Sequence, residues 1–293
     1  MRHDPRTTLR RWLKAQSTIL NWLGAKSKPY GYYIPYSYVS DLKSRDENYV
    51  FSWLMKKWDS DPQVFLHWLG KIKSYNPIFS SWSAKETPER SQSSPRFDQD
   101  WFPGLDGAMA YTLVREVKPA KVIEVGSGHS TRFLAQAIKD GELNTHLHSI
   151  DPVPRKDIDS ICDQITRNTV DKVDPQVFLD LKSKDVLFID ASHIHMPGTD
   201  VDFLFHEILP CLQKGVFIHI HDIFLPFEYP NEWQWRNYTE QHALLGLLGG
   251  GSKFKVLTAH HYFRRHHPEW LKDLNFAVLP GAKEASVWLE VVE

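Results

Sequence analysis

The sequence predicts a doubly wound α/β fold, in which helices cover both faces of a mostly parallel, Rossmann-like sheet. Short apolar strands alternate with amphipathic helices from residue 121 onward. A glycine turn, Gly126 to Gly128, joins the first of these strands to the first following helix. Asp151 and Asp190 each end a strand, and ligands bind at the carboxyl ends of strands in an open α/β sheet.

The alternation places each element in order. Strands are expected at 121–125, 145–150, 165–170, 185–190, 215–221, 253–259 and 285–291. Helices are expected at 105–117, 130–139, 156–163, 175–182, 200–212 and 233–248. Because these strands are short and apolar, they suit a sheet that is buried on both faces.

The first third of the chain has a different character, rich in aromatic residues and helical patterns. We expect residues 1–96 to form a helical extension and residues 97–293 to form the α/β domain. An amphipathic helix is expected at 7–23, docked on the domain or a second subunit in preference to a membrane surface. One or two helices are expected at 47–74, and the composition of 81–96 is that of a linker. The extension suits a substrate lid or a homo-oligomer contact.

Composition narrows the class of protein. The 293 residues are 42% hydrophobic, which is ample for a buried core, and the net charge of -1 gives no overall basic surface for an obligatory nucleic-acid partner. Cys162 and Cys211 lie in segments with helical patterns and have no metal-binding spacing, which fits a reducing cytoplasm. No apolar run reaches the roughly 18 residues of a membrane span, and the first residues lack a secretory signal. We therefore expect a soluble cytoplasmic protein.

The glycine turn predicts a nucleoside cofactor. A dinucleotide fingerprint would place a third glycine at position 131, where Thr131 stands, and Glu124 precedes the turn, so a pyrophosphate is disfavoured. A carboxylate there suits a ligand with an ammonium group and hydroxyls, and Asp151 stands where a ribose-binding acid is expected. His129 faces either the cofactor or solvent. The expected cofactor-binding residues are Glu124, Gly126, Ser127, Gly128, Ser130, Thr131, Asp151 and Asp190.

Two strand ends carry groups that suit metal binding and catalysis. Asp190 and His193 follow the fourth strand, and His221 and Asp222 follow the fifth. Asp190, His221 and Asp222 offer oxygen and nitrogen ligands for a divalent ion such as magnesium, manganese or iron, while His193 is the expected base. The alternative is that these acids cap helices and these histidines are only hydrogen bonded.

The geometry of the fifth strand limits this metal site. His219 and His221 share a strand face by period-two alternation, so His221 and Asp222 diverge unless the strand has already ended. His195 is a further candidate ligand or base.

Residues 223–238 form an aromatic segment directly after this site. It suits either a substrate wall or lid, or packing against the aromatic N-terminal region, and both readings stay open. Glu228, Tyr229 and Trp233 are the expected substrate contacts. The histidine cluster at 260–267 is expected to be a solvated loop in preference to a metal or phosphate site.

Residues 97–291 resemble one branch of the class I S-adenosylmethionine-dependent methyltransferases. The resemblance is carried by Trp101-Phe102 and by the segments 123–131, 150–155, 187–193, 198–201, 219–230 and 286–289. It implies a seven-stranded sheet with an antiparallel last strand, and S-adenosylmethionine bound by the 124–131 turn and Asp151.

Some related sugar and macrolide O-methyltransferases hold magnesium with an Asp after strand four and a Glu-Asp pair after strand five, and use a His three residues beyond the first Asp as base. Asp190, His193 and Asp222 match this pattern, whereas His221 stands in place of the Glu. The resemblance implies O-methylation of a small-molecule acceptor such as a sugar.

Three alternatives remain open. They are an N-methyltransferase, a metal-dependent hydroxylase or lyase with iron at His219, His221 and Asp190, and a non-catalytic partner protein that binds the cofactor.

Overall fold

The computed structural model describes residues 37–43, 45–82, 94–154 and 158–293. The helix expected at 7–23 and most of the expected linker at 81–96 lie outside these residues. None of the helices in the described ranges is long and apolar enough to cross a membrane.

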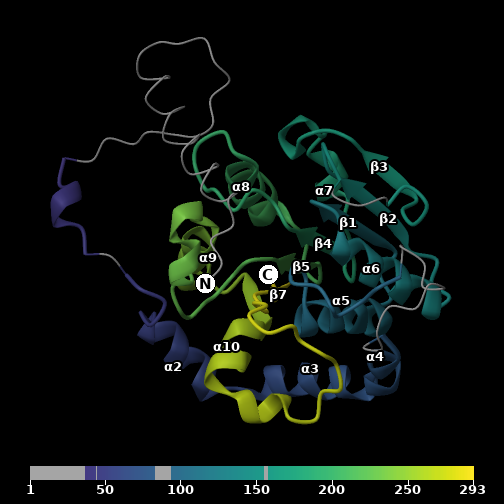
Figure 1. The fold of residues 1–293 in the computed structure, drawn as a ribbon. Coiled ribbons are helices and arrows are strands. Elements are labelled where there is room, and N and C mark those ends of the chain that lie inside the picture. The colour runs from purple at the N-terminus through teal and green to yellow at the C-terminus, as the bar shows by residue number, and fades with distance from the viewer. Residues whose placement is uncertain (1–36, 44, 83–93, 155–157) are drawn as a thin grey trace, which may run out of the picture.

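A seven-stranded sheet organises the molecule (Figure 1). Its strands are β1 (Lys121–Val125), β2 (His146–Ile150), β3 (Gln164–Thr166), β4 (Val186–Ile189), β5 (Phe217–Ile220), β6 (Phe254–Ala259) and β7 (Val287–Val291). Their order is β3-β2-β1-β4-β5-β7-β6, and only β7 runs antiparallel to its neighbours. The doubly wound fold and the antiparallel last strand are confirmed. The chain reverses its direction of strand addition between β1 and β4, where such sheets bind ligands.

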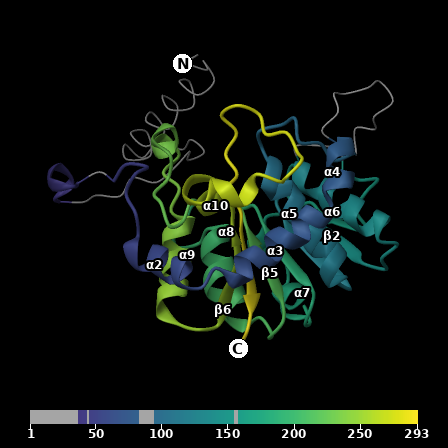
Figure 2. The ribbon, with the colours of Figure 1, turned by 90° about the horizontal axis from the view of Figure 1, so that it is seen from below.

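Helices lie on both sides of this sheet. They are α2 (Ser52–Ser60), α3 (Gln63–Ser74), α4 (Asn76–Trp82), α5 (Gly104–Val117), α6 (His129–Asp140), α7 (Gln176–Leu179), α8 (Asp200–Phe203), α9 (Glu240–Gly250) and α10 (His260–His266). After α8 the chain continues as a π turn, Leu204–Ile208, and a 3-10 turn, Leu209–Cys211. Helix α5 packs on α6, and α3 crosses beside α5 and β6 (Figure 2).

The prediction of a helix at 156–163 is wrong for its described part, because residues 158–163 form turns. Asp163 pairs with β2 instead: its carboxylate accepts a hydrogen bond from the Leu147 amide at 2.8 Å, and its own amide donates to the Leu147 carbonyl at 3.0 Å. These bonds draw the chain directly into β3. Pairing with a neighbouring strand has overridden the local helical pattern.

The histidine cluster at 260–267 is also different from the expected solvated loop. Its first seven residues form α10, whose His260, Tyr262 and Phe263 are buried. The Phe263 ring packs against Phe65 of α3 at 5.2 Å between centroids. Packing against the N-terminal helices therefore makes this segment helical.

Helix α9 begins at Glu240, seven residues later than expected. A 3-10 turn, Asn231–Arg236, precedes it and ends at Asn237, whose backbone adopts a left-handed φ of 53°. A left-handed residue cannot continue a right-handed helix, so the aromatic segment remains separate from α9.

The described N-terminal helices share one hydrophobic core with the sheet. Leu54 of α2, Ile72 of α3 and Phe79 of α4 are fully buried in the same cluster as the strand residues. The segment before α2 also forms a backbone bridge between Val50 and Phe227. The N-terminal region thus packs on the aromatic segment at 223–238, as one of the two readings of that segment requires.

Candidate active site

Two adjoining cavities open at the carboxyl ends of β1, β4 and β5. The larger has a volume of about 610 Å³ and the smaller about 380 Å³. Both are lined by Ser127, Asp190, Ala191 and Ser192, which form a shared wall. The arrangement can hold two molecules side by side.

The glycine turn after β1 approaches the end of β4 very closely. Gly126 has a φ of 79°, and a Cβ atom there would collide with the carbonyl oxygen of Asp190. The amide of Asp190 in turn donates to the carbonyl of Val125 at 2.8 Å. Glycine at position 126 is therefore required by both backbone conformation and space. This close approach fixes the shared wall between the cavities.

Asp151 lies at the end of β2 and lines the smaller cavity. One of its carboxylate oxygens accepts hydrogen bonds from the amide and the hydroxyl of Ser127, at 2.8 and 3.0 Å. The other accepts a bond from the Val153 amide at 2.8 Å. A carboxylate has about four acceptor positions, so capacity remains for a ribose hydroxyl.

Glu124 lies behind the glycine turn and not at a cavity surface, contrary to the expected direct contact with a ligand. It is fully buried, and its two oxygens accept bonds from the hydroxyls of Ser130 and Thr131, each at 2.7 Å. Thr131 also accepts a bond from the Gly128 amide. Burial raises the pKa of Glu124 to about 8, despite the two hydroxyl bonds that lower it. Glu124 and Thr131 thus hold the shape of the turn, whereas Ser127, Gly128 and Ser130 line the larger cavity.

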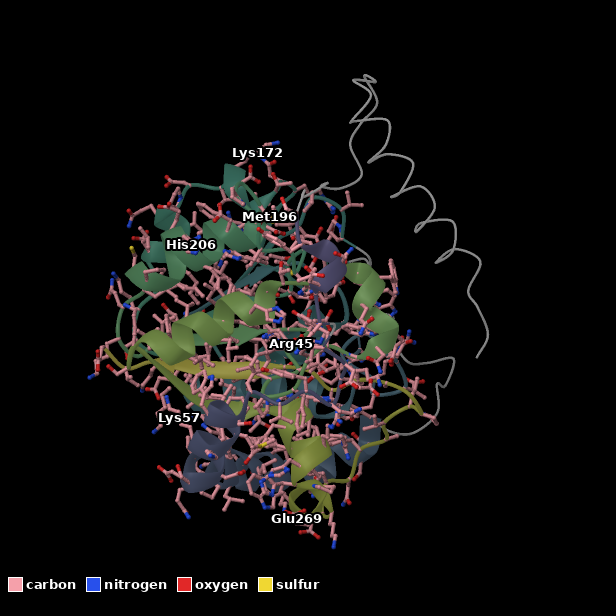
Figure 3. The ribbon with its side chains drawn as sticks, turned by 90° about the vertical axis from the view of Figure 1, so that its left-hand side faces the viewer. Arg45, Lys57, Lys172, Met196, His206 and Glu269 are labelled. Atoms are coloured by element: carbon pink, nitrogen blue, oxygen red, sulfur yellow. The ribbon has the colours of Figure 1, made fainter. Side chains whose placement is uncertain are left out.

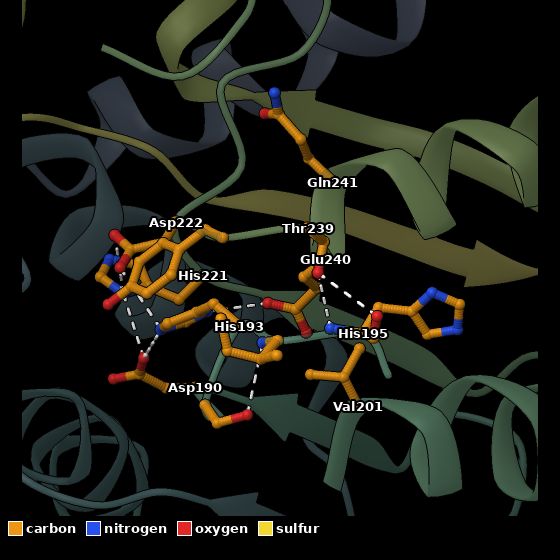
Figure 4. A network of polar contacts seen from close by, with 12 residues as sticks. Asp190, His193, His195, Val201, His221, Asp222, Thr239, Glu240 and Gln241 are labelled. Carbon is orange, nitrogen blue, oxygen red and sulfur yellow. Dashed lines mark hydrogen bonds and ion pairs between the residues drawn. The ribbon is translucent and has the colours of Figure 1, made fainter. Parts of the chain in front are cut away.

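His193 is held at the cavity by three carboxylates (Figure 4). Its Nδ1 lies 2.8 Å from Glu240, and its Nε2 lies 3.4 Å from Asp190 and 3.3 Å from Asp222. Burial alone would lower its pKa, but the charges of Asp222, Asp190 and Glu240 raise the pKa of His193 well above its usual value. Its carbonyl also accepts bonds from the amides of Thr239 and Glu240.

His221 and Asp222 converge on the same point because β5 has already ended at Ile220. Asp222 adopts a left-handed φ of 56°, which turns the chain back toward the cavity. The Nδ1 atom of His221 lies 3.3 Å from Asp190 and 3.6 Å from Asp222. The divergence that a continued strand would impose is therefore absent.

His219 points elsewhere. Its Nε2 bonds with the Ser286 hydroxyl at 2.8 Å, and its ring stacks on Phe188 at 3.7 Å between centroids. It is fully buried and does not line the cavities, so the iron site of His219, His221 and Asp190 is not assembled.

Asp190, His221, Asp222 and His193 form a closed ring in which carboxylates and imidazoles alternate. The nitrogen-oxygen separations around it are 3.3 to 3.6 Å. Asp190, His221 and Asp222 offer two carboxylates and one imidazole, which are ligand types for a divalent ion. The charges of Asp222 and Asp190 outweigh burial and raise the pKa of His221 well above its usual value, so an ion would have to displace a proton from this ring. The imidazole favours manganese or iron over magnesium, which prefers oxygen ligands.

Two buried acids, Glu240 and Asp106, complete the site, and the sequence patterns did not reveal either of them. Glu240 opens α9 and looks in sequence like any acid at a helix start. Asp106 lies in α5, bonded to His260 at 2.6 Å and to the Ser286 amide at 3.0 Å, and its carboxylate lies 3.6 Å from Nε2 of His221. A lone acid in the apolar run 104–114 was a usable signal for Asp106.

Of the three expected substrate contacts, Trp233 lines the larger cavity. Glu228 and Tyr229 lie behind this wall and bond to α9: Glu228 accepts a hydrogen bond from the Gln241 side chain at 2.9 Å, and the Tyr229 hydroxyl accepts one from the Gln241 amide at 3.1 Å. His129 lines the larger cavity, whereas His195 turns away toward His206. The aromatic segment is therefore both a cavity wall and a packing surface.

Comparison with known protein families gives one match. Residues 123–223 match a family described as a methyltransferase domain, a range that contains the glycine turn, Asp151, Asp190, His193 and His221-Asp222. No curated protein sequence matches the chain.

Similar solved structures include an O-methyltransferase, TomG from Streptomyces achromogenes, solved with SAM, at 16% identity, 75% coverage of this chain, 96% of that chain and a TM-score of 0.44. An O-methyltransferase from Bacillus cereus, solved with SAH, has 15% identity and a TM-score of 0.43, and the match covers 76% of this chain and 100% of that chain. The methyltransferase PaMTH1 from Podospora anserina, solved with SAH, has 14% identity and a TM-score of 0.40, and the match covers 90% of this chain and 100% of that chain.

Proposed function

We propose that this chain is a class I S-adenosylmethionine-dependent methyltransferase and that it methylates a hydroxyl oxygen of a small molecule. The observation that carries the proposal is the position of His193, oriented by Glu240 and lying in the wall of the larger cavity, which adjoins the smaller one. A base at this place can deprotonate an acceptor hydroxyl, which an amine acceptor does not require.

The smaller cavity suits the cofactor. Its glycine turn lets backbone approach a ligand, and Asp151 offers acceptor oxygens to ribose hydroxyls. Ser127, Gly128 and Ser130 continue from this turn into the larger cavity and suit the amino-acid part. S-adenosylmethionine, when bound, supplies an electrophilic methyl group on a positively charged sulfur.

The larger cavity suits the acceptor. Trp101 and Phe102 contribute to its lining together with Trp233 and Tyr238, giving apolar surface for a small molecule. In the transfer, the acceptor proton would move to Nε2 of an unprotonated His193, the acceptor oxygen would bond to the methyl carbon, and the bond from that carbon to sulfur would break. The surrounding carboxylates raise the pKa of His193 well above its usual value, so near neutral pH most molecules already carry a proton on this ring. His193 therefore acts as the base in the fraction that has lost this proton, and methyl transfer should rise with pH.

A divalent metal would be held by Asp190, His221 and Asp222 and would supply Lewis-acid polarisation of the acceptor hydroxyl. We further propose that residues 1–96 act as a lid or a homo-oligomer contact beside the α/β domain. Two free cysteines fit a cytoplasmic location.

The test is transfer of a labelled methyl group from S-adenosylmethionine to a panel of small hydroxylated and amine acceptors. We expect His193→Ala to lower kcat by at least about a hundredfold and Glu240→Gln by about tenfold, with little change in S-adenosylhomocysteine affinity. Glu207→Gln, at an exposed position away from the cavities, is the matched control. If the protein methylates amines, and if His193→Ala leaves that activity unchanged, the proposal of O-methylation would be overturned.

A further inference from the structure

A second group of metal-ligating side chains lies outside the catalytic cavities. Asp59 is the penultimate residue of α2. It lies beside His266 and His267 at the end of α10, a segment that follows about 200 residues later in the chain. One ligand atom from each lies within 4.8 Å of the others. Glu269, labelled in Figure 3, marks this edge of the molecule, well apart from His206 in the same view.

The separations suit a tetrahedral ion. The Nε2 atoms of His266 and His267 lie 3.4 and 3.5 Å from the same oxygen of Asp59. Ligands held about 2.0–2.1 Å from a tetrahedral metal are separated by about 3.3 Å along each edge. Both nitrogen-oxygen separations are therefore within about 0.2 Å of the value that one shared tetrahedral ion requires.

His267 is oriented by two further contacts. Its Nδ1 lies 3.0 Å from a carboxylate oxygen of Glu269, and its ring stacks on Trp270 at 3.8 Å between centroids with an interplanar angle of 2°. A proton on Nδ1 that is donated to Glu269 leaves Nε2 with a lone pair, and this atom lies 3.0 Å from the Tyr262 hydroxyl, a contact that a bound ion would replace. A carboxylate behind a ligating histidine is the usual outer contact of zinc sites.

Asp59 is held from its other side. The Tyr262 hydroxyl donates a hydrogen bond to Asp59 at 2.6 Å, and Tyr262 itself is packed between Trp58 and Phe65. Asp59 and His266 are each about two-fifths exposed, so an ion can reach them from solvent. The cluster thus combines a fixed inner side with an open outer side.

We propose that Asp59, His266 and His267 bind a divalent transition-metal ion, with zinc as the type ion, and that the ion ties α2 to α10. Two imidazoles and one carboxylate match the ligand preference of zinc, and water completes the tetrahedron. Helix α10 also carries His260, which bonds to Asp106 beside the active site. The bound ion therefore stabilises the packing of the N-terminal helices on α10, the helix whose His260 contacts Asp106.

The test is a zinc titration of the chelator-treated full chain by calorimetry, with stoichiometry and affinity as readouts. We expect His266→Ala and Asp59→Asn each to remove one zinc equivalent. Glu269→Gln should weaken that equivalent by about tenfold without removing it, as expected for an outer contact. His67→Ala, an exposed histidine of α3, is the matched control and should titrate like wild type.

Thermal unfolding of the same proteins tests the tie between the helices. At a hundredfold excess over its dissociation constant, zinc should raise the Tm of wild type by about 5 °C. His266→Ala, folded as judged by circular dichroism, should lack this rise. A zinc titration of His266→Ala identical to wild type would overturn the site, and equal zinc stabilisation of both proteins would overturn the tie.

Discussion

Glu124 carries its carboxyl group in a fully buried place behind the glycine turn. Loss of hydration raises its pKa to about 8, and the negative charges of Asp190 and Asp151 act in the same direction. At neutral pH the folded protein therefore keeps a proton there that an unfolded chain has released. This difference links the stability of the glycine turn to pH.

Replacing Glu124 with Gln should make the protein less sensitive to pH. Between an ordinary glutamate pKa of 4.5 and the folded value of about 8, the folded state binds the extra proton, so the free energy of unfolding of wild type falls as pH rises. The contribution is at most about 4 kcal/mol between pH 5 and 8. Chemical denaturation across this range should show the fall in wild type and in the exposed Glu142→Gln control, and a flatter profile in Glu124→Gln. Parallel profiles for all three proteins would contradict the prediction.

Single residues also show what the sequence could predict. Asp190, His193 and Asp222 follow strand ends, and the order of a parallel sheet brings such ends to one edge. Glu240 could not be found in the same way, since it is 47 residues from His193 and its role depends on where α9 begins. The start of α9 depends in turn on the left-handed Asn237.

At the scale of elements, the end of β5 decides how the candidate metal ligands meet. The strand stops at Ile220, and the left-handed Asp222 turns both it and His221 toward Asp190. The strand pattern alone could not predict this turn, because it gives no sign of where strand pairing ends. The same holds for residues 158–163, where Asp163 pairs with β2 and displaces the expected helix.

Exchange of His221 for Glu should change the preferred metal. A carboxylate in place of the imidazole gives an all-oxygen ligand set, which suits magnesium. We expect His221→Glu to reach half-maximal activity at a magnesium concentration about tenfold lower than wild type, whereas wild type responds better to manganese or iron. His206→Gln, at an exposed position, serves as the control. Activity of both proteins that ignores chelator and added metal would contradict the metal site.

At the scale of the whole molecule, the N-terminal helices and the aromatic segment at 223–238 are one packed unit. The Phe51 amide donates to the Pro226 carbonyl at 2.8 Å, and the Phe51 ring lies 6.1 Å from that of His242 in α9. Residues before α2 thereby contact both the aromatic segment and the helix that orients His193. The general fold was predictable from strand and helix patterns, but this association joins segments too distant for any local pattern.

Phe51→Ala should therefore affect the acceptor more than the cofactor. Loss of the ring loosens the contact with the aromatic segment and leaves β1, β2 and the glycine turn untouched. We expect the acceptor KM to rise by about fivefold, with the affinity for S-adenosylhomocysteine within twofold of wild type. Lys57→Ala, exposed on α2, is the control. Equal weakening of acceptor and cofactor would point to general unfolding and against a selective role.

The anchoring of residue 193 to the first turn of α9 has a kinetic consequence. His193 is bonded there through both its ring and its carbonyl, so it travels with α9 and with the wall packed on that helix. The glycine turn, in contrast, belongs to the β1 side of the sheet. Under the proposed function, the donor contacts the glycine turn and the acceptor contacts the His193 side. The separation of the reacting atoms, and with it the rate, then depends on Asp190, which lines both cavities.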